Sequence, residues 1–339
     1  MDLKSAVALL VEGKNLEQQQ MRDVMQQIMT GKATDAQIGA LLVALRMKGE
    51  TVDEITAAAG VMRELVTAVE ISGKNIVDIV GTGGDGLKTF NISTTCCFVV
   101  AAAGATVAKH GNRSVSSTSG SADLLEAAGV NLNLSHQQVG QCIDKIQLGF
   151  MFAPLHHSAM KYTIGPRKEL SIRTIFNLLG PLTNPAGVSN QLLGVFSAEW
   201  LEPLALALKN LGSNHVMVVH SDDGLDEISI SATTQVCELK QGKIQRYQIN
   251  PQQFGLNSSP LDELIVNSAE QSLDMVKSVL DNQPGAARDI VSLNSGAAIY
   301  CAGISDSLEQ GIEKAQQIIA DGLAKQKLQQ LIEISNSFK

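Results

Sequence analysis

The sequence of 339 residues is poor in aromatic residues and in positive charge. Phe, Trp and Tyr make up 4% of the chain, and the formal net charge is −8. A general nucleic-acid surface needs a basic field to release counterions, and single strands usually stack on aromatic side chains. The composition therefore argues against nucleic-acid binding. A polyanionic small molecule would have to be held by local donors and metal ions.

Long apolar runs and a cysteine framework are also missing. No stretch approaches the roughly 20 apolar residues that cross a bilayer, and residues 1–4 lack the basic and apolar regions of a secretory signal. The five cysteines, with Cys96 and Cys97 adjacent, show no metal-ligand spacing and leave an odd thiol in any pairing scheme. We expect a cytoplasmic protein whose cysteines are reduced packing residues.

The chain does contain two kinds of sequence. From residue 3 to about residue 69 apolar residues recur at helical spacing, and Thr34 with Gln37 and Thr51 with Glu54 form capping boxes. After Lys74, β-branched runs alternate with helical stretches, which predicts a largely parallel α/β sheet.

The predicted fold class is therefore α/β, with a small all-helical domain beside a larger α/β domain whose central, mostly parallel sheet is flanked by helices. We place the boundary between residues 1–72 and 73–339. The segment from Met160 to Leu179 is helical and need not belong to the sheet, so it is a candidate to return to the small domain. Buried strands are predicted at residues 76–80, 106–108, 150–153, 192–196 and 216–219.

Residues 78–94 are the most informative stretch, because a β-branched strand runs into a glycine-dense turn that opens a helix. Gly81, Gly83, Gly84 and Gly86 let the backbone adopt crowded conformations and bring N–H groups against an anion, and the helix N-terminus adds to the attraction. Asp85 repels a bare phosphate, so a phosphate that also carries a metal ion or a ribose fits better.

Two further loops are rich in polar groups and follow predicted strands. Residues 109–121 hold Lys109, Arg113, Asn112 and several hydroxyls that suit phosphate oxygens. Residues 221–227 hold three aspartates and a glutamate, which suit magnesium that also binds substrate phosphate. We favour Asp226 and Glu227 as metal ligands because apolar residues anchor them on both sides. The alternative for each loop is a solvated surface turn.

A fourth cluster lies at residues 156–170. Arg167 offers a planar fork for a carboxylate, whereas the adjacent His156 and His157 would point to different faces of a helix and lack a third zinc ligand. No serine elbow or cysteine–histidine arrangement indicates a covalent site. We therefore assign no catalytic acid, base or nucleophile, and we expect rate enhancement from positioning and electrostatics.

Several ordered motifs together resemble the anthranilate phosphoribosyltransferase family of tryptophan biosynthesis. They are residues 81–86, 91–94, 109–113, 120–123, 173–185 and 223–227. The resemblance extends over essentially the whole chain. It implies a small helical domain completed by helices from about residues 165–185, and homodimers formed through the helical domains. The implied substrates are anthranilate and 5-phosphoribosyl 1-diphosphate with Mg²⁺.

The resemblance also implies roles for individual residues. Ser93 would contact one magnesium ion, and Asp226 with Glu227 the other. Anthranilate would meet Gly81, Asn112 and Arg167. The phosphoribosyl diphosphate would be surrounded by Gly81, Gly84, Asp85, Thr89, Asn91, Ile92, Ser93, Thr94, Lys109, His110, Gly111, Asn112, Arg113, Ser114, Val115, Ser116, Ser117 and Ser121.

The sequence departs from the family pattern at two places near the expected anthranilate entrance. Ser158 follows His157 where the family usually has proline, and Gly165-Pro166 precedes Arg167 where a Pro-Val pair is common. Two other interpretations remain open. A pyrimidine nucleoside phosphorylase would share the architecture but carry a Lys-His-Ser motif in place of Lys109-His110-Gly111. A transferase-like nucleic-acid binder would need a basic groove.

Overall fold

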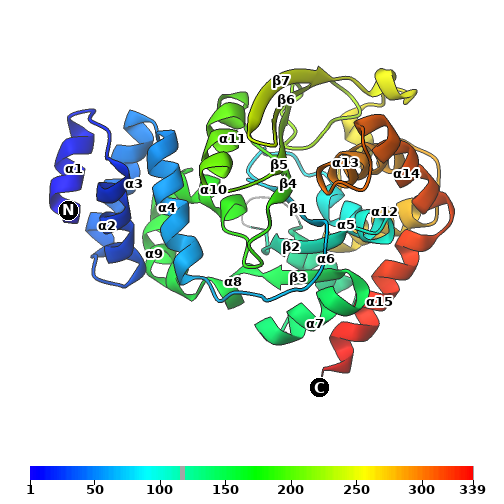
Figure 1. The fold of residues 1–339 in the computed structure, drawn as a ribbon, viewed down its shortest axis with the longest axis horizontal. Coiled ribbons are helices and arrows are strands. Elements are labelled where there is room, and N and C mark those ends of the chain that lie inside the picture. Colours follow the sequence, from blue (N-terminus) through cyan, green and yellow to red (C-terminus); the bar gives the residue numbers. More distant parts are fainter. Residues whose placement is uncertain (115–118, 339) are drawn as a thin grey trace.

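The structure, a computed structural model, describes residues 1–114 and 119–338. Its N-terminal part forms four helices that pack together at one end of the molecule (Figure 1). Both predicted capping boxes, at Thr34 and at Thr51, are present. The helices are α1 (Leu3–Val11), α2 (Gln18–Met29), α3 (Asp35–Lys48) and α4 (Val52–Leu65).

The rest of the described chain is built on one sheet with the strand order β3-β2-β1-β4-β5-β6-β7. The first five strands run parallel, whereas β6 and β7 are antiparallel. The predicted mostly parallel sheet is confirmed. The strands are β1 (Ile76–Gly81), β2 (Thr106–Gly111), β3 (Leu148–Phe152), β4 (Asn190–Gly194), β5 (His215–Ser221), β6 (Thr234–Lys240) and β7 (Lys243–Ile249).

Helices cover both faces of this sheet (Figure 1). One face packs against α5 (Ile92–Ala102), α13 (Ala286–Cys301) and α15 (Leu323–Ser337), and α12 (Ala269–Leu280) and α14 (Leu308–Ala320) pack onto these helices. The other face, at β4 and β5, packs against α11 (Leu201–Asn210). The remaining helices are α6 (Ser121–Ala127), α7 (His136–Ile146), α8 (Ala153–His156), α9 (Lys161–Leu170) and α10 (Ile175–Leu179).

The segment from Met160 to Leu179 contacts the N-terminal helices. Helix α9 contacts α2 and α3, and α10 contacts α3 and α4. Apolar side chains of α1 to α4 share one buried core with α10, α11 and one face of β4 and β5. The N-terminal helices are therefore packed onto the sheet-bearing part through α10 and α11.

Two features of the sheet differ from the sequence prediction. Strand β2 runs on to Gly111, so Lys109 and His110 lie inside the strand and not in the loop after it. Strands β6 and β7 were missed. Their turn places Gln241 and Gly242 at positive φ, which is typical of a tight hairpin. Strand β7 was hard to predict because it is a largely exposed edge strand whose polar sequence lacks a hydrophobic pattern.

The five cysteines are free and buried, including Cys96 and Cys97 in α5. Burial raises the pKa of Cys97 to about 12, so this thiol stays protonated near neutral pH. The prediction that the cysteines are reduced packing residues is confirmed.

A buried pair links β5 to β6 and provides a test of the fold. The His215 ring lies 2.8 Å from the Glu238 carboxylate, and Glu238 is 1% exposed. Burial alone would raise the pKa of Glu238, but hydrogen bonds from His215, Gln245 and Tyr247 outweigh it and lower the pKa from 4.5 to about 2. A carboxyl whose pKa is depressed on folding stabilises the fold above its unfolded pKa.

We expect Glu238→Gln to lower the free energy of unfolding by about 2 kcal/mol at pH 7, the scale of a hydrogen bond to a charged group. The difference from the wild-type protein should shrink as the pH falls from about 4.5 toward about 2, where Glu238 itself becomes protonated. Urea unfolding of both proteins at several pH values measures this difference in the free energy of unfolding. The exposed Glu199→Gln is the control, and a difference independent of pH would contradict the assignment.

Candidate active site

The candidate site lies where β1 and β4 end side by side. Strand β1 pairs with β2 on one edge and with β4 on the other, so the order in which strands are added to the sheet reverses between β1 and β4. Ligands bind at such a switch point in open α/β sheets. Gly81 and Gly194 are partners in the parallel register at these strand ends. A Cβ atom at Gly81 would lie 2.6 Å from the Asp226 carboxylate, and one at Gly194 would overlap the Asp226 carbonyl oxygen. The two glycines therefore make room for the acidic loop.

The glycine loop after β1 has the conformation that its sequence predicts. Gly83, Gly84 and Gly86 all have positive φ, between 62° and 80°, which favours glycine. The Gly83 N–H donates to Asp226 Oδ2 over 3.0 Å. The acidic loop therefore accepts a hydrogen bond from one of the amides that the sequence analysis assigns to an anion.

The acidic loop after β5 is held from both sides as predicted, because Leu225 and Ile228 are buried. Asn294 of α13 fixes it further: its Oδ1 accepts from the Ile228 N–H over 2.9 Å, and its Nδ2 donates to the Ile228 carbonyl over 2.8 Å. The Asp223 carboxylate accepts hydrogen bonds from the nearby hydroxyls of Ser229 and Ser231. Asp226 faces the glycine loop through its bond from Gly83, and Glu227 faces the start of α5 through a bond from the Ser93 N–H.

Carboxylates crowd together at this point. Burial raises the pKa of Asp85. Burial, and to a smaller extent the nearby Asp85, raises the pKa of Asp226 to about 7. Burial, and to a smaller extent Asp226, raises the pKa of Glu227 to about 8. Like-charged groups that share a partly buried site favour a cation among them. Among the described residues no group of three or more His, Cys, Asp or Glu side chains is arranged to hold a metal ion by itself. An all-oxygen set that needs further ligands from water and substrate suits Mg²⁺.

Lys109 provides positive charge inside this site. It is 4% exposed, and its Nζ donates to the Ile79 carbonyl over 2.6 Å and to Ser93 Oγ over 3.3 Å. Lys109 lowers the pKa of Glu227, although burial and Asp226 outweigh it. The structure therefore brings Lys109, Ser93 and Glu227 together, with Lys109 reaching the site from the strand.

At the start of α5 two backbone amides already have partners, because the Ile92 N–H donates to the Phe90 carbonyl over 2.7 Å and the Ser93 N–H bonds to Glu227. Asn91 is the N-cap residue, but its side chain does not cap the helix. Its Oδ1 accepts from the hydroxyls of Ser119 and Ser272, and its Nδ2 donates to the Ser119 carbonyl. Ile92 and Thr94 are buried, at 2% and 1% exposed, so Ile92 could serve a ligand only through its backbone. Thr89 pairs with Ile265 at an isolated bridge.

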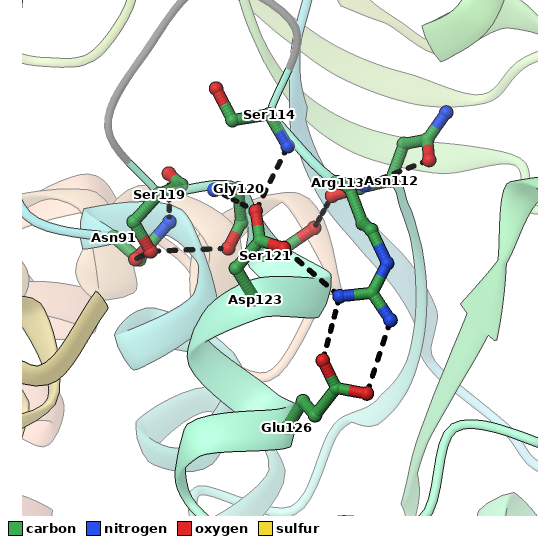
Figure 2. Close-up of polar contacts among 9 residues, drawn as sticks. All are labelled: Asn91, Asn112, Arg113, Ser114, Ser119, Gly120, Ser121, Asp123 and Glu126. Carbon is green, nitrogen blue, oxygen red and sulfur yellow. Dashed lines mark hydrogen bonds and ion pairs between the residues drawn. The ribbon is translucent and has the colours of Figure 1, made fainter. Parts of the chain in front are cut away.

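The second polar loop is closed by Asp123, as Figure 2 shows. Its Oδ2 accepts from the Ser114 N–H over 3.0 Å and from the Gly120 N–H over 2.8 Å. Arg113 pairs with Asp123 and forms a two-pronged ion pair with Glu126. Val115, Ser116 and Ser117 lie outside the described residues.

Around this loop the predicted residues differ in what their side chains contact. Ser121 Oγ donates to the Asn112 carbonyl over 3.2 Å, and Asn112 itself is exposed. A Cβ at Gly111 would overlap Ser121 Oγ. The ring of His110 lies 5.0 Å from that of His157, and burial lowers the pKa of both, to about 4 for His157. These imidazoles are neutral at pH 7.

Arg167 lies on α9, half-buried, with its guanidinium 5.3 Å from the centre of the Phe176 ring. No carboxylate pairs with it within the parts of the chain that the structure describes. Burial lowers its pKa. A guanidinium with these surroundings is suited to a carboxylate ligand.

Sequence reasoning missed several residues that shape the site. Asp123 could have been found, because Gly120 and Asp123 have the spacing of a capping box. Arg173 opens the motif at residues 173–185, but its role could not be read from it. Gly194 and Asn294 carry no local signal, since each acts on a segment far away in the sequence. Arg173 donates from Nη2 to the Gly84 carbonyl and stacks 4.3 Å above the centre of the Phe196 ring.

Comparisons with known proteins agree on a family with two domains. A model described as "Glycosyl transferase family, helical bundle domain" matches residues 4–66, and one described as "Glycosyl transferase family, a/b domain" matches residues 73–325. The chain is similar to the anthranilate phosphoribosyltransferase of Methylococcus capsulatus, with 57% identity over 100% of this chain and 99% of the relative. It is also similar to that of Marinomonas sp., with 56% identity over 100% and 98%.

Solved structures give the same result. The anthranilate phosphoribosyltransferase (TrpD) of Thermus thermophilus matches with a TM-score of 0.92 and 41% identity, over 98% of this chain and 99% of that one. The enzyme of Saccharomyces cerevisiae in complex with PRPP and Mg matches with a TM-score of 0.91 and 26% identity, over 99% and 98%. Within the described chain, none of the helices is both long and apolar enough to cross a membrane.

Proposed function

The chain belongs to the glycosyl transferase family defined by this helical bundle and α/β domain, and we propose that it is an anthranilate phosphoribosyltransferase of tryptophan biosynthesis. It transfers the phosphoribosyl group of 5-phosphoribosyl 1-diphosphate to the amine of anthranilate and releases diphosphate. The observation that carries the proposal is the meeting of the glycine loop, the Lys109–Ser93 pair and the acidic loop at the ends of β1, β4 and β5.

We assign the phosphoribosyl diphosphate to the glycine loop, the start of α5 and the loop after β2. Their main-chain amides and hydroxyls suit phosphate oxygens. The assigned residues remain Gly81, Gly84, Asp85, Thr89, Asn91 to Thr94, Lys109 to Ser117 and Ser121. The contacts of Lys109 favour a role in holding Ser93 and balancing Glu227.

Ser93 would contact one Mg²⁺ ion, and Asp226 with Glu227 would hold the other, in both cases together with the diphosphate. When bound, Mg²⁺ would stabilise the negative charge that builds on the leaving diphosphate. If the Asp226 carboxylate turned toward the metal, its Oδ2 would release the Gly83 N–H, which would then face the phosphate. Asp226 would in this way link metal binding to the exposure of one amide of the phosphate loop.

Anthranilate is assigned to Gly81, Asn112 and Arg167. Its amine is uncharged near neutral pH and is already a nucleophile, so no strong base is needed. The residues around it have to orient the amine toward the ribose carbon, and the loop amides have to stabilise the departing diphosphate. This chemistry is consistent with a site whose two nearby imidazoles are neutral and buried.

Two alternatives are less well supported. A pyrimidine nucleoside phosphorylase would carry serine after Lys109-His110, where this chain has Gly111, and a Cβ there would overlap Ser121 Oγ. A nucleic-acid binder would need a basic groove, whereas the chain has a net charge of −8 and retains Asp226 and Glu227.

We further propose that residues 1–72 form the small domain, completed by α9 and α10, and that the rest of residues 73–339 forms the large domain. We also propose that the protein is a homodimer joined through the helical domains. Val11 and Met47, in α1 and α3, are 74% and 83% exposed and support an apolar contact there. Cytoplasmic location is proposed because the pathway is metabolic.

For Arg167→Ala we expect the KM for anthranilate to rise about 30-fold, with little change in the KM for 5-phosphoribosyl 1-diphosphate. The estimate corresponds to the loss of a charge-assisted bond of about 2 kcal/mol. Initial rates with each substrate varied in turn measure both constants. Lys168→Ala, at an exposed position on the same helix, is the control. A rise confined to the phosphoribosyl donor would contradict the assignment.

The function itself is tested by product analysis. Purified protein is incubated with anthranilate, 5-phosphoribosyl 1-diphosphate and Mg²⁺, and the products are identified by mass spectrometry and a diphosphate assay. We expect N-(5-phosphoribosyl)anthranilate and diphosphate in equal amounts. Absence of the adduct, together with phosphorolysis of a pyrimidine nucleoside, would favour the phosphorylase instead.

A further inference from the structure

Arg173 connects two parts of the site that are distant in the sequence. It lies between α9 and α10, close to the helix that carries Arg167, and its Nη2 donates to the carbonyl of Gly84 in the glycine loop. Its guanidinium is stacked 4.3 Å above the centre of the Phe196 ring, just beyond the end of β4. No carboxylate pairs with Arg173 within the described residues.

The glycine loop has few other attachments. At its base the Thr82 N–H donates to the Gly194 carbonyl over 2.9 Å, and Thr82 Oγ1 accepts from the Phe196 N–H over 3.1 Å. Further along, the Gly83 N–H donates to Asp226. This last attachment joins a metal-assigned carboxylate to an amide of the proposed phosphate loop, so metal and phosphate both compete with it. The bond from Arg173 uses neither and can persist.

The geometry of the peptide bond gives this attachment a specific effect. In a trans peptide the C=O and the following N–H lie in one plane and point in opposite directions. Holding the Gly84 carbonyl therefore also fixes the direction of the Asp85 N–H. It also keeps a carbonyl oxygen, which would repel phosphate, turned toward a cation. Gly84 has no Cβ and adopts a φ of +80°, so no side chain restrains the peptide planes on either side of it.

On these grounds we propose that Arg173 is a positioning residue for the phosphoribosyl diphosphate, acting through the Gly84 carbonyl. The inference rests on the proposed function. Because Arg173 and Arg167 lie on one short segment, Arg173 also ties the donor loop to the helix assigned to anthranilate. Phe196 supports the arrangement, since a planar guanidinium stacks on an aromatic ring while its N–H groups stay free to donate in the plane.

The experiment compares Arg173→Gln, Arg173→Lys and Phe196→Leu with the wild-type protein, with Lys168→Gln as a surface control on α9. For Arg173→Gln we expect the KM for 5-phosphoribosyl 1-diphosphate to rise about tenfold, the scale of one lost charge-assisted bond, while the KM for anthranilate changes less than threefold. Arg173→Lys should recover only part of the loss, because ammonium cannot both stack and donate in a fixed plane. Phe196→Leu should show a smaller effect in the same direction.

Amide hydrogen exchange of the ligand-free proteins separates this inference from the proposed function. Faster exchange in a peptide covering residues 82–87 of Arg173→Gln, without a change in α11, would support the positioning role even if the transferase assay failed. Unchanged exchange would overturn the inference. Full recovery by Arg173→Lys would also overturn it, because charge alone would then be sufficient.

Discussion

Replacing Asp226 by asparagine should lower turnover by about 100-fold or more and raise the Mg²⁺ concentration needed for half-maximal rate. Asparagine has nearly the same shape but lacks the negative charge that balances a divalent cation. Losing several kcal/mol of charge stabilisation corresponds to a factor of this size, since each 1.4 kcal/mol or so is tenfold. Steady-state rates at a series of Mg²⁺ concentrations measure both quantities.

The control for this prediction lies in the same loop. Asp222 is exposed and its carboxylate accepts from Gln235, away from the glycine loop. Asp222→Asn should therefore leave the rate and the Mg²⁺ dependence close to those of the wild-type protein. Equal effects of the two substitutions, or an unchanged rate in Asp226→Asn, would refute a metal-binding role for Asp226.

Gly194→Ala should abolish most of the activity although residue 194 contacts no substrate in our assignment. A Cβ at this position would overlap the carbonyl oxygen of Asp226, so the acidic loop would have to move. Forcing atoms into an occupied space usually costs about 1–3 kcal/mol of stability, and a displacement of about 1 Å at a catalytic group can lower the rate about 100-fold. Thermal unfolding and initial rates give the two effects.

Gly39→Ala provides the comparison for this substitution. Gly39 lies in α3, and a Cβ there would meet nothing within 4 Å. Alanine is the better helix former by about 1 kcal/mol, so this variant should be as stable as the wild-type protein or more so, with unchanged activity. If Gly194→Ala behaved like Gly39→Ala, the packing of the acidic loop against β4 would be wrong.

The five parallel strands were largely predictable because each is a short apolar run next to a helical pattern. Buried β-branched residues such as Val77 and Val107 leave a strong signal. The hairpin of β6 and β7 has a weak sequence signal, because the exposed face of β7 is polar and its pairing with β6 is a tertiary contact. The end of β2 was also misplaced, because Lys109 is a charged residue that the buried strand accepts only through its bonds to Ile79 and Ser93.

The kinds of residue in the site could be predicted, but many of their partners could not. A glycine turn after a strand and an acidic loop after another strand are local patterns. That Gly83 would donate to Asp226, 143 positions away, depends on the order of the strands in the sheet. The two-pronged pair between Arg113 and Glu126 was not expected either, since a phosphate-binding loop suggests a free arginine. Val115, Ser116 and Ser117 stay predictions.

The most direct test of the central claim follows anthranilate fluorescence in purified protein with 5-phosphoribosyl 1-diphosphate. With Mg²⁺ present, we expect the anthranilate signal to fall with time and in proportion to enzyme concentration. With excess chelator the signal should stay constant, and added Mg²⁺ should restore its decline. A signal that stays constant under all conditions, or a decline that the chelator does not affect, would contradict a metal-dependent transfer to anthranilate.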